Sequence, residues 1–319
     1  MTMHKSSISS RARLAGSIFA TALAVFGGTA MAKPLTSIGV TMGSLGNPYF
    51  VALTKGITAE ARANGANVTV TSVSADYDLN KQFTQIDNFI AAGVNLIVIN
   101  AVDPNAILPA IKRAQKAGIA VVAADVAANG ADATIMTDNT LAGSESCAFL
   151  AQKLGGKGNV IIENGPQVSS VTDRVKGCKT ALAKSPDIKI LSFDQDAKGS
   201  RDGGLQVMQG YLIRYPDING VFAINDPQAI GSELAAKQQH RNGIVITSVD
   251  GAPDIVSSLK ANGLIEASAS QDPYTMGRLA VKAGREILDG HPPAEKITLM
   301  APKLITKANV DSYVGWTQH

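Results

Sequence analysis

Short apolar runs alternate with amphipathic segments along most of this chain, and one such arrangement occurs twice. Leu96 to Asp125 reads LIVINAVDPNAILPAIKRAQKAGIAVVAAD, and Val221 to Asp250 reads VFAINDPQAIGSELAAKQQHRNGIVITSVD. Each copy contains an apolar strand, a polar turn with Asp-Pro, a helix, a glycine and a second apolar strand that ends at an aspartate. A repeat of this length predicts two similar α/β units rather than an array of short repeats.

A second repeated arrangement lies upstream of each copy. Ser37 to Val70 is matched by Asn159 to Ile190 in the order strand, loop, helix, strand. The apolar strands are short and flanked by turn residues, which is typical of parallel strands buried on both faces. The sequence therefore predicts an α/β protein of two similar lobes, each a doubly wound parallel sheet, joined by a three-segment hinge with a ligand cleft between them.

The three hinge segments are predicted from turns that precede a change of register. A Thr-Asp-Asn turn at 137–139 marks the first crossing, the second follows Gln271, and the third falls near 301–304. These crossings predict an N-terminal lobe formed by residues 33–137 plus 272–301 and a C-terminal lobe formed by residues 138–271 plus 302–319.

The first 32 residues have the pattern of a cleavable export signal. Basic residues precede an apolar stretch from Leu14 to Phe26, and small residues at Ala30 and Ala32 fit the specificity of signal peptidase. A membrane anchor is the alternative, but the apolar run is short for a span and ends in a cleavable small-residue motif. We therefore expect a signal peptide at 1–32, cleaved after Ala32, and a mature protein in the periplasm.

Charge and composition exclude several classes of function. The formal net charge is +3, part of which belongs to the predicted signal, so the mature chain is near neutral and we expect neither nucleic acid nor a membrane surface as partner. The chain has 4 His and 2 Cys, which predicts no metal site and no catalytic triad. Cys147 and Cys178 fall in two predicted helices; they form a disulfide if those helices are neighbours, and otherwise are two buried thiols.

Polar and aromatic residues follow the predicted strands of the first lobe. Asn47, Tyr49 and Phe50 lie in the loop after the first strand, at the edge where open α/β sheets bind ligands. This loop lacks the glycine pattern of a dinucleotide or phosphate site. An amide beside aromatic faces is suited to hydroxyl groups and apolar sugar C–H surface. Asp125 reaches the same edge from a later strand.

The second lobe offers a corresponding set. Asn225 and Asp250 end two of its strands, and Gln271 ends a third. Arg174 is placed in the first turn of a helix that Ser170 or Thr172 caps, an end where the helix dipole disfavours a cation. Its planar set of donors therefore suggests a partner such as a hydroxyl group or a carboxylate. Two lobes meeting edge to edge would bring Asp125 and Asp250 to one cleft.

The order and spacing of several short motifs resemble a known family. The motifs are NPYF at 47–50, VVAAD ending at Asp125, TDN at 137–139, DRVKG at 173–177, INDPQAIG at 224–231, SVDGAPD at 248–254 and SQDP at 270–273. Together they resemble the ribose-binding-protein type of periplasmic binding proteins, the sugar-capturing components of ABC importers. The resemblance implies a ligand held by Asn47, Asp125, Arg174, Asn225, Asp250 and Gln271, with Tyr49 and Phe50 as aromatic walls.

Two positions depart from that family pattern. Val126 replaces an arginine of the ribose binders, and Lys198 or Gly199 stands where they place an aromatic wall. Both changes touch the ligand, so a different pentose, a hexose, an open-chain polyol or a cyclitol is expected rather than ribose.

The sequence thus predicts a monomeric, cofactor-free solute-binding protein. It captures a neutral sugar or polyol by hinge closure and delivers it to the membrane permease of an ABC transporter. One alternative is a glycoside-processing enzyme that uses Asp125 and Asp250, although the charge of Arg174 is expected to lower the pKa of both carboxyls. A sensor that presents its closed form to a chemoreceptor or sensor kinase is another. A transcription repressor would need an N-terminal DNA-binding motif where the export signal lies.

Overall fold

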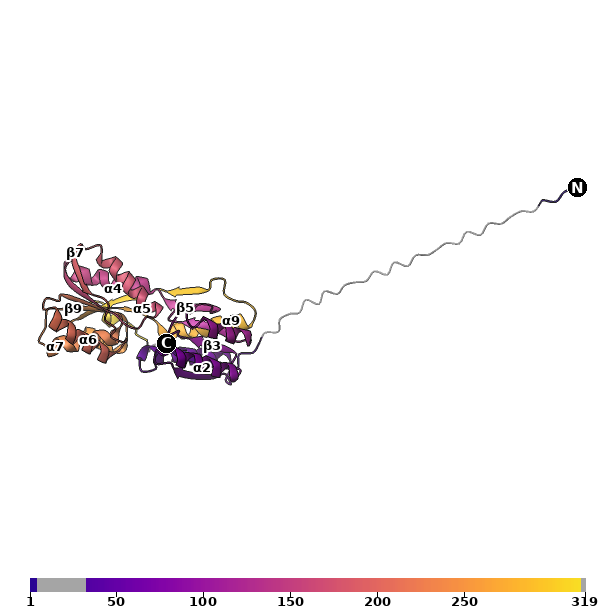
Figure 1. The fold of residues 1–319 in the computed structure, drawn as a ribbon, viewed down its shortest axis with the longest axis horizontal. Coiled ribbons are helices and arrows are strands. Elements are labelled where there is room, and N and C mark those ends of the chain that lie inside the picture. Colours follow the sequence, from indigo (N-terminus) through magenta and orange to yellow (C-terminus); the bar gives the residue numbers. More distant parts are fainter. Residues whose placement is uncertain (5–32, 317–319) are drawn as a thin grey trace. The chain divides into compact units, whose positions relative to one another are not determined.

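The computed structural model of the protein describes residues 1–4 and 33–316 (Figure 1). The predicted export signal and its cleavage site after Ala32 lie outside the described residues, apart from the first four. In the part of the chain that is described, none of the helices combines the length and the apolar character needed to cross a bilayer.

The first lobe is built on a parallel six-stranded sheet with the order β11-β5-β4-β3-β1-β2. Its strands are β1 (Ser37–Met42), β2 (Thr69–Ser74), β3 (Leu96–Ile99), β4 (Ala120–Ala124), β5 (Ala133–Thr137) and β11 (Ile297–Met300). Its helices are α1 (Pro48–Asn64), α2 (Leu79–Ala91), α3 (Leu108–Lys116) and α9 (Pro273–Leu288). Every residue of β3 and β4 is buried, as expected for central strands covered on both faces.

The second lobe repeats this order as β12-β10-β9-β8-β6-β7. Its strands are β6 (Lys157–Glu163), β7 (Asp187–Ser192), β8 (Gly220–Ala223), β9 (Val245–Asp250), β10 (Ile265–Ser270) and β12 (Lys303–Thr306). Its helices are α4 (Asn139–Lys153), α5 (Ser169–Leu182), α6 (Arg201–Arg214), α7 (Asp226–Gln238), α8 (Pro253–Lys260) and the short η1 (Val310–Ser312). Among the described residues of this sheet, only β12 pairs antiparallel, with β10 as its neighbour. The predicted fold class is confirmed, and the sequence repeat corresponds to two copies of one strand order.

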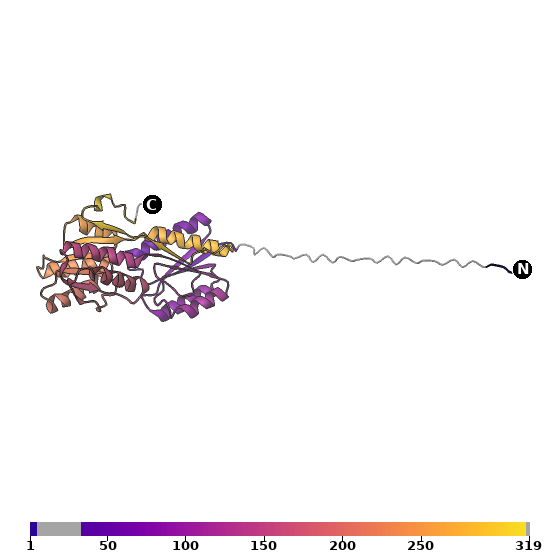
Figure 2. The same cartoon turned by 90° about the horizontal axis from the view of Figure 1, so that it is seen from above.

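The chain passes between the two sheets at three points (Figure 2). It enters the second sheet after β5, returns to the first after β10, and crosses again between β11 and β12. The predicted turn at 137–139 spans the first connection, Gln271 begins the second, and residues 301–304 include the third and the start of β12. The exact lobe boundaries of the sequence analysis stay a prediction.

Helices cover both faces of each sheet, as a doubly wound fold requires. In the first lobe α1 packs against α9 and α2 against α3; in the second α4 packs against α5 and α6 against α7. Figure 1 shows α4 and α5 together on one side of β9, with α6 and α7 on the other. The hydrophobic core that α1 and α9 share also contains Trp316, near the C-terminus.

The pair α4 and α5 is held unusually close. A Cβ atom on Gly143 would lie 2.0 Å from the backbone oxygen of Arg174, so only glycine permits this approach. One turn further along each helix, Cys147 and Cys178 are fully buried and joined by a disulfide. The structure thereby decides between the two states that the sequence left open. The packing of α4 on α5 also fixes the backbone from which Arg174 extends.

Candidate ligand-binding site

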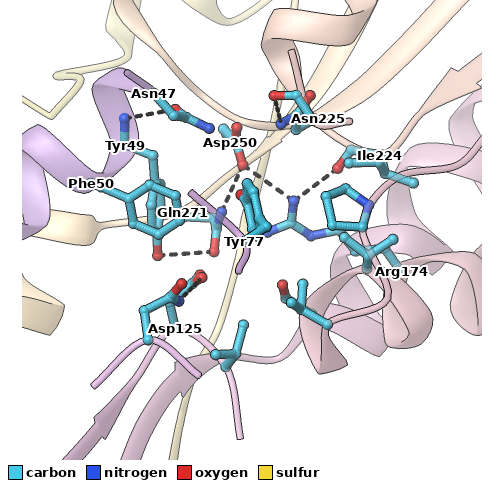
Figure 3. A pocket seen from close by; sticks show the side chains of 17 residues that line it. Asn47, Tyr49, Phe50, Tyr77, Asp125, Arg174, Ile224, Asn225, Asp250 and Gln271 are labelled. Atoms are coloured by element: carbon cyan, nitrogen blue, oxygen red, sulfur yellow. Dashed lines mark hydrogen bonds and ion pairs between the residues drawn. The ribbon is translucent and has the colours of Figure 1, made fainter. Parts of the chain in front are cut away.

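The carboxyl ends of strands from both sheets converge on one small pocket with a cavity volume of about 40 Å³ (Figure 3). All eight residues predicted to bind ligand line it. The lining residues are Asn47, Tyr49, Phe50, Tyr77, Asn100, Asp125, Val126, Pro166, Val168, Ser170, Val171, Arg174, Gly199, Ile224, Asn225, Asp250 and Gln271.

The first wall comes from the start of α1. Asn47 caps this helix, and its Oδ1 accepts a hydrogen bond from the backbone N–H of Tyr49 at 2.9 Å. The side-chain NH₂ of Asn47 is left to face the pocket (Figure 3). Tyr49 and Phe50 are both buried and meet edge to face with ring centroids 5.4 Å apart. Capping and aromatic packing therefore fix this wall before any ligand is present.

Asp125 directly follows β4 and has a backbone φ of 73°, in the left-handed region that non-glycine residues rarely adopt. The side-chain NH₂ of Asn100 donates to its Oδ2 at 2.9 Å. Burial raises the pKa of the Asp125 carboxyl above its ordinary value, although Arg174 opposes the shift. Backbone strain at a buried acid is typical of a functional position.

Asn100 is a site residue that the sequence analysis missed. It follows β3, as Asn225 follows β8, and the two occupy the same position in the repeat, where VIN is matched by AIN. Superposing the two halves of the repeat would therefore have found it. The Asn100 side chain also accepts a hydrogen bond from the N–H of Gly43 at 3.1 Å, so it links two loops of the first lobe.

Arg174 lies deeper in its helix than predicted. α5 begins at Ser169 with Val168 at the N-cap and no side-chain cap, so the expected capping by Ser170 or Thr172 is wrong and Arg174 falls in the second turn. Its Nε donates to Asn139 Oδ1 at 2.8 Å. Its Nη1 donates to the backbone oxygen of Ile224 at 2.8 Å and lies 3.4 Å from Asp250 Oδ1.

Asp250 ends β9 and is 3% exposed. Gln271 donates to it twice, from Nε2 to Oδ1 at 2.7 Å and from its backbone N–H to the Asp250 carbonyl at 2.9 Å. Burial raises the pKa of Asp250 to about 6, although Arg174 and Gln271 act in the opposite direction. Arg174 acts on the pKa of Asp125 and Asp250 in the expected direction, but both pKa values are raised overall, because desolvation of the buried carboxyls exceeds the attraction of one cation.

Behind Asp250 lies a second buried acid, Asp226, at the start of α7. Its carboxylate accepts hydrogen bonds from Ser268 Oγ and from the backbone N–H of Ala252, both at 2.7 Å. Burial, reinforced by the charge of Asp250, raises the pKa of Asp226 to about 8. Asp226 therefore anchors the loop that follows Asp250, and acts by positioning it.

Asn225 reaches the pocket while serving as the N-cap of α7. Its Oδ1 accepts from the backbone N–H of Gln228 at 3.1 Å, and its Nδ2 donates to the Gly199 carbonyl at 3.0 Å. One N–H and one lone pair of the amide are left for a ligand. The cap fixes the orientation of the amide without using all of its hydrogen-bonding capacity.

The remaining lining residues are mostly apolar or small, and no metal-binding cluster of His, Cys, Asp and Glu occurs among residues 1–4 and 33–316. Tyr77 and Ser170 are polar exceptions that the sequence analysis did not identify as ligand contacts. Tyr77 lies in the loop that follows β2, and Ser170 lies in the first turn of α5. The site is therefore a set of hydrogen-bonding groups in an apolar surround.

The chain was compared with models of known protein families. The family model described as periplasmic binding protein domain matches residues 38–292. The chain belongs to this family of periplasmic binding proteins.

Individual relatives cover most of the chain. A ribose import binding protein of Bacillus subtilis (strain 168) is 34% identical over 257 residues, which cover 80% of this chain and 82% of the relative. A xylitol-binding protein of Mycolicibacterium smegmatis is 31% identical over 292 residues, which cover 89% of this chain and 81% of the relative. The solved structure of an ABC transporter periplasmic solute-binding protein from Actinobacillus succinogenes with bound D-allose has a TM-score of 0.80 at 27% identity, and covers 88% of this chain and 100% of that one.

Proposed function

We propose that this protein is the solute-binding component of an ABC importer, which captures a neutral sugar or polyol outside the cytoplasm and delivers it to a membrane permease. The observation that carries the proposal is the position of Asp125 and Asp250. The two buried carboxyls come from opposite lobes and line the same pocket, together with amide groups and Arg174. The relatives that bind ribose, xylitol and D-allose support the same class of ligand.

The chemistry of the pocket favours hydroxyl groups. Asp125 and Asp250 accept hydrogen bonds, Arg174 donates them, and the amides of Asn47 and Gln271 do either. Bonds to ionised acceptors are roughly twice as strong as bonds between neutral groups. Two carboxylates face one guanidinium, so an anionic ligand such as a sugar phosphate is disfavoured. A neutral compound with many hydroxyl groups matches this set.

The division of the site between two lobes provides the mechanism of capture. Asn47 and Asp125 extend from the first lobe, whereas Arg174, Asn225 and Asp250 extend from the second. A ligand contacts both groups only when the lobes are closed, so it shifts the population toward the closed form. The closed form is then the one that the permease recognises. Closure requires no second copy of the chain, and we propose a monomer.

Val126 and Gly199 narrow the range of candidate ligands further. Both line the pocket, and neither side chain supplies a hydrogen-bond donor or an aromatic face. We therefore propose a ligand other than ribose, from among other pentoses, hexoses, open-chain polyols and cyclitols.

Two alternative activities make different predictions. A glycoside-processing enzyme would use Asp125 and Asp250 as acid and base, and the raised pKa of Asp250 is the observation in its favour. We expect no release of nitrophenol from 4-nitrophenyl glycosides; release that Asp250→Asn abolishes would establish the enzyme instead. A sensor role would add a chemoreceptor or sensor kinase as a second partner for the closed form.

A thermal-shift screen of residues 33–319 tests the proposed function. D-ribose, D-allose, xylitol and other neutral polyhydroxy compounds are compared with amino acids and ribose 5-phosphate, because a ligand of the folded state raises the melting temperature. We expect a shift only within the neutral group. Asp250→Ala should abolish the shift and leave the protein folded, whereas Asp254→Ala, whose side chain is 70% exposed, should retain it. A shift with amino acids alone would contradict the proposal.

A further inference from the structure

Tyr77 is held in the cleft by an unusual backbone. It lies between β2 and α2, and both Asp76 and Tyr77 have φ values in the left-handed region, at 52° and 56°. The Tyr77 N–H donates to the Gly43 carbonyl at 3.0 Å, and the Asp76 side chain bonds to Ser74 and Lys81. Two successive non-glycine residues in this region are disfavoured, so the surrounding contacts determine where the Tyr77 ring lies.

The Tyr77 ring bridges the two lobes between a pair of glycines. On the first lobe, a Cβ atom at Gly43 would lie 2.8 Å from Tyr77 Cε1, so the ring covers a position that only glycine permits. On the second lobe, a Cβ atom at Gly199 would lie 4.0 Å from the Tyr77 hydroxyl oxygen. The hydroxyl group therefore extends from one lobe to the surface of the other.

Tyr77 also separates two cavities. It lines the ligand-binding pocket and a neighbouring cavity of about 390 Å³, which Asn47 and Gly199 line as well. The second cavity is likewise lined by both lobes, including Ser44, Gly46, Asn47 and Pro48 of the first and residues 198–201 of the second. The ring thus forms part of the partition between the candidate site and a larger space.

The Tyr77 hydroxyl group is available to a ligand. It has no hydrogen-bond partner among the described residues 1–4 and 33–316. Burial, followed by the charges of Asp125 and Asp250, raises the pKa of this phenol, so it stays a neutral O–H donor. Figure 3 shows Tyr77 among Asp250, Gln271 and Arg174.

We propose that Tyr77 is a specificity-determining residue that donates a hydrogen bond to a ligand hydroxyl and closes the pocket toward the second cavity. The inference rests on the proposed function and deepens it. The ligand is a free monosaccharide or polyol, because a glycosidic or ether substituent directed at the partition would collide with the ring. Without the ring, such a substituent would extend into the second cavity.

Titration calorimetry on residues 33–319 tests the proposal. The ligand is whichever of D-ribose, D-allose and xylitol gives the largest thermal shift, and its mono-O-benzyl ethers are the bulky probes. Tyr77→Phe should weaken binding of the parent compound about tenfold, the usual effect of losing one hydrogen bond, with an unchanged melting temperature of the free protein. Tyr77→Ala should weaken it further and bind at least one benzyl ether that the wild type excludes.

Tyr215→Phe and Tyr215→Ala are matched controls, because the Tyr215 hydroxyl bonds to the Leu191 carbonyl and its side chain lines neither cavity. Both should bind the parent compound as the wild type does and exclude the ethers. Wild-type affinity in both Tyr77 variants, with the ethers still excluded, would overturn the role of Tyr77 and leave the proposed function intact. Failure of the wild type to bind any of the three parent compounds would instead refute the proposed function, and the inference with it.

Discussion

The indole Nε1 of Trp316 lies 3.1 Å from the backbone oxygen of Asp250. The same N–H also points at the carbonyl of Gln271, at 3.0 Å. The indole ring packs edge-on against Tyr49, with 5.7 Å between ring centroids. One side chain near the C-terminus therefore contacts site residues of both lobes, and it holds the backbone of two of them in place.

Trp316 should report ligand binding directly. It is the single tryptophan of the sequence, and it borders Tyr49 on the first lobe and Asp250 on the second. Closure or opening of the lobes changes these contacts, so we expect the emission intensity or maximum to change saturably with ligand. Trp316→Phe should remove the signal and weaken binding, since two carbonyl groups lose their shared donor, at a cost of about 1–2 kcal/mol. Unchanged emission during binding that calorimetry detects would contradict this prediction.

Loss of Arg174 should destabilise the protein even without ligand. Arg174→Met leaves the buried carboxylate of Asp250 without its cation, which typically costs about 3–5 kcal/mol in the free energy of unfolding. Urea unfolding at pH 7 measures the loss, and adding Asp250→Asn should recover part of it. Arg201→Met is the control, because Arg201 pairs with Asp254 at the surface and such pairs contribute about 0–1 kcal/mol.

Arg174→Lys should fail to restore ligand binding. Lysine keeps the charge but lacks the separate Nε and Nη donors that reach Asn139, the Ile224 carbonyl and Asp250. We expect at least a tenfold loss of affinity in calorimetry. Affinity equal to that of the wild type would show that only the charge matters at this position.

Ligand affinity should fall in acid. Burial raises the pKa of Asp250 to about 6 and raises that of Asp125, so both carboxyls gain protons as the pH falls and lose their ionised acceptors. If the ligand requires ionised Asp250, affinity drops up to about tenfold per pH unit below pH 6. Calorimetry from pH 4.5 to pH 8 measures the slope, and Asp250→Asn should flatten it. A flat wild-type profile would mean that neither carboxyl titrates in this range.

Glu163 should make the protein less stable as the pH rises. Both of its carboxylate oxygens accept from Ser232 Oγ at 2.9 Å, and burial raises its pKa from 4.5 to about 8. Because the folded-state pKa exceeds the unfolded value, its favourable contribution is complete below pH 4.5 and is lost as the pH rises toward 8. Glu163→Gln should therefore stabilise the protein at pH 8, by roughly 3–4 kcal/mol, and have little effect at pH 4.

Glu266→Gln is the matched control for that measurement. Glu266 is partly buried and bonds to Lys153 and Lys307, and its pKa is lowered despite the opposing effect of desolvation. The pKa shift of Glu266 is opposite in sign to that of Glu163. The Glu266 carboxylate therefore stabilises the folded protein above its ordinary pKa, and this contribution is lost in acid. Removing the charge should destabilise the protein at neutral pH. Urea unfolding at pH 4 and pH 8 measures the change in unfolding free energy for both variants. If that change has the same pH dependence in Glu163→Gln and Glu266→Gln, the opposite pKa shifts assigned to the two residues are contradicted.

The sequence by itself determined the architecture and the edge of each sheet that carries the site. Strand and helix periodicities are local, and their repetition implied two similar lobes. The carboxyl ends of parallel strands share one edge, so Asp125 and Asp250 were predicted to meet in a cleft, and both line the pocket. Asn100 was also predictable in principle, since it holds in the first repeat the position of Asn225 in the second.

Only the tertiary structure decided the features that depend on contacts between distant segments. The disulfide required α4 and α5 to be neighbours, and the contribution of Trp316 required the C-terminal segment to return beneath the site. The position of Tyr77 depends on Gly43, where a Cβ atom would lie 2.8 Å from the Tyr77 ring. The net pKa shift of Asp250 depends on how far burial exceeds the attraction of Arg174. Periodicity encodes which face of an element is buried, but desolvation and close packing are properties of the assembled neighbours.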